Sequence, residues 1–213
     1  VSENQGRPIH TGVKFEVEDT TISAIAVDGF RLARKTYHTE DATGRTMSFV
    51  VPAQGLKEVE KILTDSDEGV AFTLGQKHIL FQIGNATLVC RLLEGDFLDY
   101  NAAIPKTEKT TIEVSTRQLV EGIERTSLLI SDRLRSPLKL NMSDEKIRIS
   151  CNTTMGKAYD EVDCKLDGDG INMGFNNKYL LDALKASDCD MVKLQINGPV
   201  SPMRVVPLEG RDR

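Results

Sequence analysis

The stretch VKFEVEDTTISAIAV at residues 13–27 has a counterpart in LKLNMSDEKIRISCN at residues 138–152. Apolar residues occupy the same positions in both stretches, and a polar turn, Glu18-Asp19 or Ser143-Asp144, interrupts each at the same place. The two stretches begin 125 positions apart. Alternation of apolar and polar residues is typical of half-buried antiparallel strands, so each stretch predicts a β-hairpin.

A second pair of similar segments follows in the same order. SFVVPAQGLKEVEKIL at residues 48–63 matches NMGFNNKYLLDALKAS at residues 172–187, at an offset of 124, and a strand pair is expected after each. Two halves of merely alternating β-sequence would not place a helix at the same point. The repeat therefore predicts a duplicated domain.

Three helices are expected, over residues 53–63, 116–130 and 177–186. Their apolar stripes are formed by Leu56, Val59, Ile62 and Leu63, by Leu119, Val120 and Ile123, and by Tyr179, Leu180, Ala183 and Leu184. Ser115 with Gln118 has the form of a capping box, and Asn176 is a candidate N-cap. The expected fold class is α+β, with an antiparallel sheet in each domain and helices on one face.

The composition excludes several classes of protein. The 213 residues are 39% hydrophobic and 28% charged, a globular balance, and no apolar run approaches the length of a membrane helix. No secretory signal pattern opens the chain, and the four scattered cysteines are interpreted as reduced in a cytoplasmic protein. The net charge of −5 argues against a nucleic-acid-binding protein, although net charge does not reveal where the charges lie.

No catalytic constellation is found in the sequence. The histidines lack metal-ligand spacing, no cysteine lies beside an activating histidine, and the run Asp167–Gly170 lacks the further ligands of a calcium loop. We expect no catalytic residue, no metal and no cofactor. A β-rich hydrolase with a loop-borne site stays as an unfavoured alternative.

Four segments together carry a family resemblance: VDGFRLAR at 27–34, FVVPAQGLKEVEKIL at 49–63, RLLEGDFLDYNAAIP at 91–105 and GFNNKYLLDALKA at 174–186. In order and spacing they resemble the bacterial replicative sliding clamp, the beta subunit of DNA polymerase III. The resemblance implies repeated DNA-clamp domains whose helices line a hole for DNA. Residues 1–107 would be the middle domain, lacking its first strand and helix, and residues 108–213 the C-terminal domain, lacking its last strand.

The function implied by this resemblance is that of a processivity factor in bacterial DNA replication. The family forms a homodimeric ring that encircles duplex DNA and tethers DNA polymerase III, the clamp loader and repair polymerases through linear peptides. It is a non-catalytic part of a DNA-directed DNA polymerase, a nucleotidyltransferase. A peptide-binding scaffold without DNA function is the second alternative.

The resemblance also assigns residues to two surfaces. The DNA-facing basic residues on the helices would be Lys57, Lys61, Arg117, Arg125, Lys178 and Lys185. The peptide cleft between the two domains would be formed by Arg7, His10, Val27, Gly29, Phe30, Arg31, Leu32, Leu98, Ala102, Ala103, Leu134, Asn176, Tyr179, Val200 and Pro202. Phe30, Leu98 and Ala102 depart from the usual His, Pro and basic residue of the family, which predicts a more apolar cleft.

Overall fold

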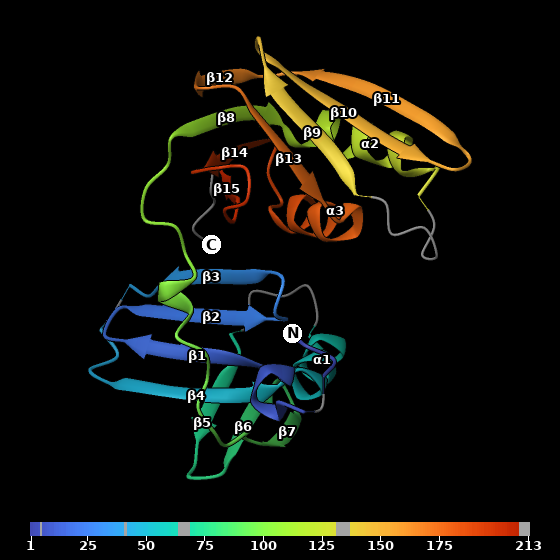
Figure 1. Cartoon of the computed structure of the whole chain (residues 1–213). Helices are drawn as coiled ribbons and strands as arrows, with labels where there is room; N and C mark the ends of the chain where they lie inside the picture. Colours follow the sequence, from blue (N-terminus) through green and yellow to red (C-terminus); the bar gives the residue numbers. More distant parts are fainter. Residues whose placement is uncertain (5, 41, 64–68, 131–136, 209–213) are drawn as a thin grey trace. The chain divides into compact units, whose positions relative to one another are not determined.

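The computed structural model describes residues 1–4, 6–40, 42–63, 69–130 and 137–208 (Figure 1). Contacts divide the described residues into two units, unit 1 from Val1 to Asp99 and unit 2 from Tyr100 to Leu208. The domain boundary expected at residues 107 and 108 lies slightly further along the chain. Each unit is described by itself below.

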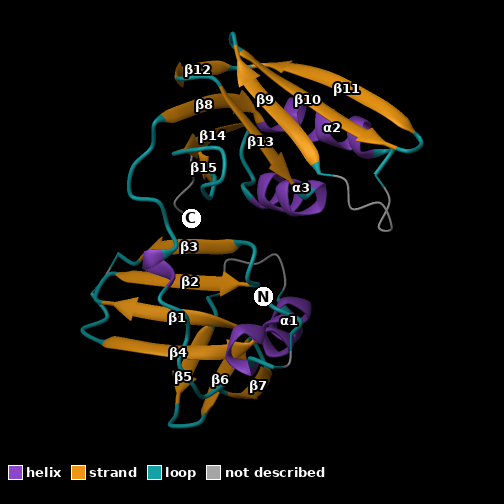
Figure 2. Ribbon diagram, viewed as in Figure 1, coloured by secondary structure: helices purple, strands orange, loops and turns teal. Residues whose placement is uncertain are grey.

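The described residues of unit 1 form two antiparallel sheets and one α-helix (Figure 2). The larger sheet has the order β3-β2-β1-β4, and the smaller sheet has the order β5-β6-β7. The elements are η1 (Pro8–Thr11), β1 (Gly12–Glu18), β2 (Thr21–Val27), β3 (Leu32–His38), β4 (Thr46–Pro52), α1 (Ala53–Ile62), β5 (Ala71–Leu74), β6 (His78–Ile83) and β7 (Ala86–Arg91).

In the part of unit 2 that the structure describes, there are two four-stranded antiparallel sheets and two α-helices. The sheet orders are β11-β10-β9-β13 and β12-β8-β14-β15. The elements are η2 (Tyr100–Ala102), β8 (Thr110–Ser115), α2 (Thr116–Ser127), β9 (Leu138–Ser143), β10 (Lys146–Thr153), β11 (Gly156–Asp163), β12 (Lys165–Gly168), β13 (Ile171–Phe175), α3 (Asn177–Ala186), β14 (Met191–Ile196) and β15 (Arg204–Pro207).

Strand register confirms the duplication. Val17 pairs with Ile22 in the first hairpin, and Met142 pairs with Ile147 in the second, so both partners are displaced by 125 positions. The sheets built on these hairpins have equivalent orders, and α1 and α3 start 124 positions apart, at Ala53 and Asn177. The offsets of 125 and 124 found in the sequence therefore also relate the equivalent strands and helices of the structure.

The hairpin turns show why polar residues recur at these points. Asp19 has a φ of 47°, and Asp144 and Glu145 have φ values of 55° and 58°. Aspartate tolerates the left-handed region better than most residues because its short side chain can hydrogen-bond locally. The acidic positions therefore close the two hairpins.

The α+β class is confirmed, but two details of the expectation are wrong. Each unit has two sheets where one was expected, because alternation identifies a strand without identifying its hydrogen-bonded neighbour. Two residues expected in the apolar stripes of the helices are also not buried. Leu63 is 45% exposed and lies just after α1, and Ala183 is an exposed residue of α3. Val59, Leu180 and Leu184 are the buried residues of those two helices.

The strand β5 differs from its counterpart β14. Among the described strands, β5 pairs only with β6, whereas β14 lies between β8 and β15. Phe72 on β5 is 41% exposed, while Val192, Leu194 and Ile196 on β14 are buried. The same type of strand is thus an open edge in unit 1 and a central strand in unit 2.

The four cysteines are free thiols. Cys90 and Cys151 are buried, and Cys164 and Cys189 are half-buried. Burial raises the pKa of Cys164 to about 11, with a further contribution from the charges of Glu145 and Asp163. No helix in the described part of the chain is long and apolar enough to cross a membrane.

Candidate functional site

The loop between β2 and β3 presents an aromatic side chain to solvent. One carboxylate oxygen of Asp28 accepts hydrogen bonds from the backbone N–H groups of Phe30 and Arg31, at 3.1 and 3.0 Å. The other oxygen accepts from Arg31 Nε at 2.7 Å, and Gly29 takes a φ of 90°. Phe30 is 82% exposed, so the loop holds a large apolar ring in water at a hydrophobic cost.

The electrostatics of this loop favour a fixed geometry. Partial burial alone would raise the pKa of Asp28, but the hydrogen bonds from the Arg31 side chain and the two backbone N–H groups together lower it. The carboxylate therefore stays ionised near neutral pH and keeps its three donors. Asp28 was absent from the predicted site, although an Asp-Gly pair between two strands is a turn signal.

The other predicted binding residues of unit 1 have mixed exposure. Arg7 and Arg31 are exposed, His10 and Leu32 are half-buried, and Val27 is buried at 4% exposure. The ring of His10 meets Phe97 edge-on, with the ring centroids 5.4 Å apart. Leu98, the residue after Phe97, is 44% exposed. Val27 can therefore support the loop from beneath, while the others can reach a ligand.

Six further predicted residues, including Asn176, lie in the described part of unit 2. Val200 is 97% exposed, Pro202, Ala102 and Ala103 are exposed, and Tyr179 is half-buried. Such exposure excludes a core role for Val200.

Asn176 caps α3, because its Oδ1 accepts from Lys178 N and Tyr179 N at 3.0 and 3.4 Å. Its NH₂ group is then the part of the side chain that can donate to a ligand. The predicted residue Leu134 lies outside the described residues.

All six basic residues predicted to face DNA are on helices, and ion pairs with carboxylates are formed by Lys61, Arg117, Arg125 and Lys185. Lys61 pairs with Glu58 at 2.9 Å on α1, and Arg117 pairs with Glu121 at 2.8 Å on α2. Arg125 pairs with Asp160 of β11 at 2.7 Å, and Lys185 of α3 pairs with Glu124 of α2 at 2.7 Å. Lys57 and Lys178 are exposed. The acidic partners were not predicted to be part of a site.

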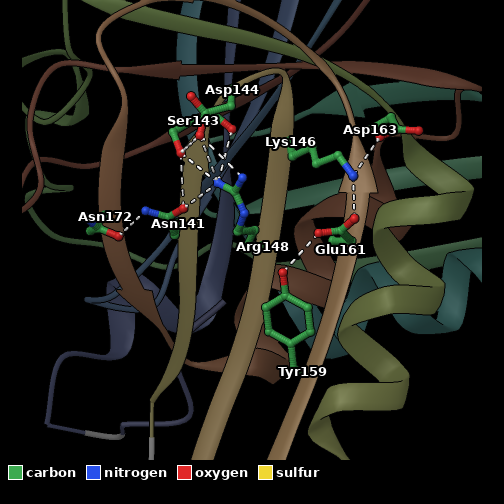
Figure 3. A network of polar contacts seen from close by, with 9 residues as sticks. All are labelled: Asn141, Ser143, Asp144, Lys146, Arg148, Tyr159, Glu161, Asp163 and Asn172. Carbon is green, nitrogen blue, oxygen red and sulfur yellow. Dashed lines mark hydrogen bonds and ion pairs between the residues drawn. The ribbon is translucent and has the colours of Figure 1, made fainter.

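A second polar network covers the sheet β11-β10-β9-β13 (Figure 3). Arg148 Nη1 donates to Ser143 Oγ at 2.8 Å and to Asn141 Oδ1 at 3.2 Å. Lys146 donates to Glu161, and Tyr159 donates to the same carboxylate at 3.0 Å. Side chains alternate along a strand, so Glu161 lies on the opposite face of β11 from its neighbour Asp160, which contacts α2.

The described residues offer little that suggests catalysis. They contain no group of three or more His, Cys, Asp or Glu side chains able to hold a metal ion. A shallow hollow of about 250 Å³ in unit 1 is lined by Lys14, Ser48 and Phe97 among others, and it includes none of the predicted binding residues. Most of the predicted residues that the structure describes are exposed or half-buried.

Comparison with known proteins identifies both units. The family profile for the DNA polymerase III beta subunit, central domain, matches residues 1–99, and the profile for its C-terminal domain matches residues 101–212. The beta sliding clamp of Staphylococcus aureus (strain Mu50) is 29% identical over 209 residues, which are 97% of this chain and 55% of that protein. The chain thus spans about half the length of this curated relative.

Solved structures give the same result. The DNA polymerase sliding clamp from Bacillus subtilis has 31% identity and a TM-score of 0.95, covering 100% of this chain and 57% of that one. The DNA polymerase III subunit beta from Pseudomonas aeruginosa has 28% identity and a TM-score of 0.93, covering 100% and 58%.

Proposed function

Because the chain belongs to the DNA polymerase III beta-subunit family, as its central and C-terminal domains, we propose that it is part of a replicative sliding clamp. In this role it encircles duplex DNA as part of a homodimeric ring in the cytoplasm. It carries out no covalent chemistry and acts by keeping a tethered polymerase at high effective concentration near the primer end. The observation that carries the proposal is that one family profile matches each unit, in the family's own order.

The DNA contact is proposed to come from the helices. Arg117, Arg125 and Lys185 project from α2 and α3, with side-chain exposures of 86%, 58% and 56%. Cations on a helix face contact phosphates without reading base sequence. A protein that must slide needs contacts of this non-specific kind.

The polymerase contact is proposed to come from exposed apolar side chains that capture a linear peptide. Phe30, Leu98 and Val200 supply apolar surface, and Arg7, Arg31 and Asn176 can bind the polar groups of the peptide. The Asp28 hydrogen bonds hold the Phe30 loop in advance, which lowers the entropy cost of binding.

A peptide titration tests this second contact. The probe is a fluorescein-labelled decapeptide of glutamine and serine with one leucine and one phenylalanine, and the control peptide has serine at both apolar positions. We expect measurable anisotropy change with the first peptide only, and a loss of about tenfold in affinity for Phe30→Ser and Val200→Ser. Equal binding of both peptides, or no effect of both substitutions, would contradict the proposal.

A duplex titration separates the clamp from a peptide-binding scaffold without DNA function. Two labelled 30-base-pair duplexes of unrelated sequence are titrated with the chain at low salt. The clamp proposal predicts equal affinities that fall steeply with salt. A scaffold would bind the apolar peptide and neither duplex.

A further inference from the structure

The cation Arg117 and its carboxylate partner on α2 stand in the less stabilising of the two possible orders. Arg117 lies in the first turn of α2, where the helix dipole disfavours a positive charge, and its partner Glu121 follows four residues later. The opposite order, with the acid first, stabilises helices better. Stabilisation of α2 is therefore a weaker reason for this pair than for the acid-first pair of Glu121 with Arg125.

The pairing continues around α2. Glu121 also lies 3.7 Å from Arg125, which Asp160 holds from the neighbouring strand. The hydrogen bond from Arg117 is the main cause that lowers the pKa of Glu121, so this carboxylate stays charged near neutral pH. Glu124 reaches across to Lys185 of α3, so a separate ion pair joins the two helices.

On the proposed function, on which this inference rests, these cations meet DNA phosphates. We propose that Glu121, Glu124 and Asp160 compete with the DNA phosphates for the helix cations. This competition weakens each contact with a phosphate and so allows the protein to slide. Each cation gives up a carboxylate when it takes a phosphate, so one ion pair replaces another. The net free energy gained when a cation contacts a phosphate is therefore small, and the free energy needed to break that contact is small as well.

This exchange has a signature in the salt dependence of binding. A free cation that meets a phosphate releases about 0.9 counterion from the duplex, and each such contact steepens the log–log salt slope by that amount. A cation that must first leave a carboxylate exposes that carboxylate to solution, which offsets the favourable change. Affinity and slope should then both be smaller than the number of basic residues predicts.

The test compares two doubly substituted chains with the same change in net charge. Glu121→Gln/Glu124→Gln releases Arg117 and Lys185 from their partners on the helices. Glu161→Gln/Asp163→Asn removes the two carboxylates that pair with Lys146 in the network of Figure 3, on the other face of the sheet from α2. Binding to a labelled 30-base-pair duplex is measured by anisotropy from about 20 to 150 mM salt.

We expect the helix variant to bind about tenfold more tightly than the parent chain at low salt, with a slope steeper by about 1.8. The control variant should gain about twofold, with little change of slope. Equal gains in the two variants would overturn the inference and leave the proposed function standing. Absence of binding by the parent and both variants at the lowest salt would contradict the proposed DNA contact itself.

A substitution cycle gives a second measurement. Arg117→Gln should weaken DNA binding by less than about twofold in the parent chain, and by about fivefold in a chain that carries Glu121→Gln. The difference measures the coupling between the carboxylate and the phosphate contact. Equal losses in both backgrounds would show that Glu121 does not compete with DNA, because the two substitutions would then act independently.

Discussion

Unit 1 and unit 2 share a strand register but differ in the extent of their cores. Among the described residues, the core cluster of unit 2 contains 17 buried side chains, whereas that of unit 1 contains 7. Among the described helices, α2 and α3 of unit 2 both contribute buried leucines, whereas α1 of unit 1 contributes Val59 as its buried residue. The comparison predicts that the two domains, built on one duplicated pattern, differ in stability, because buried area and not register sets the hydrophobic gain.

The largest expected effect comes from a pair of equivalent isoleucines. Ile147 is fully buried in unit 2, and Ile22, 125 positions earlier, is half-buried in unit 1. We expect Ile147→Ala to destabilise its unit by about 3–4 kcal/mol and Ile22→Ala by about 1–2 kcal/mol, since the cost follows burial and the cavity left. Urea denaturation measures both.

Thiol labelling assigns each transition to its unit. Cys90 reports on unit 1 and Cys151 on unit 2, because both are buried in the folded chain. Labelling of Cys90 should occur at lower urea than labelling of Cys151. Labelling of both cysteines in a single transition would mean that the two units unfold together, and would remove the predicted difference in stability.

The next effect concerns a glycine in α1. A Cβ at Gly55 would lie 2.5 Å from Cys90 Sγ, whereas the equivalent position of α3, 124 residues later, is occupied by Tyr179. Gly55→Ala should destabilise unit 1 by about 1–3 kcal/mol, because this overlap outweighs the better helix propensity of alanine. Thermal unfolding measures the change, and Cys90→Ala in the same chain should restore part of it. Additive losses would show that Cys90 is not the obstacle.

A smaller effect is expected at the helix N-termini. Asn176 caps α3 with its side chain, while Pro52, the equivalent residue before α1, makes no side-chain cap. Asn176→Ala should cost about 1 kcal/mol in urea denaturation, and Asn176→Ser should restore most of it because serine also accepts from the first-turn N–H groups. Equal losses for alanine and serine would assign the effect to packing.

The smallest effect is expected on the surface of α2. Glu121→Gln/Glu124→Gln should leave the urea midpoint of unit 2 unchanged within error, because exposed ion pairs contribute little to stability. This result would also establish that the DNA-binding variant is folded. A clear drop of the midpoint would show that the pairs stabilise the packing of α2 on α3.

Sequence patterns predicted the elements with strong periodicity and missed those without it. Residues 138–143 alternate strictly and form β9, and the caps at Ser115 and Asn176 were identified from residue type alone. The strand β11 was not predicted, because GKAYDEVD contains few apolar residues. Its position depends on pairing with β10, which a local pattern does not encode.

The candidate site was predictable only in part for the same reason. The basic residues of the helices were identified, but the pair between Arg125 and Asp160 joins positions 35 residues apart and depends on how β11 packs against α2. The family resemblance also identified Phe30 as a site residue, but not the loop conformation that exposes its ring. The high exposure of that ring follows from the hydrogen bonds of Asp28, which only the folded loop brings together.

The open strand β5 has a consequence for handling the protein at the bench. Among the described strands, β5 pairs on one side only, and its other side, beside the exposed Phe72, is a template on which another chain can add a strand. Concentrated or warmed samples should therefore lose solubility through unit 1 first. Thr73→Lys places a charge on an exposed position of that strand, and we expect it to slow aggregation of the stored protein.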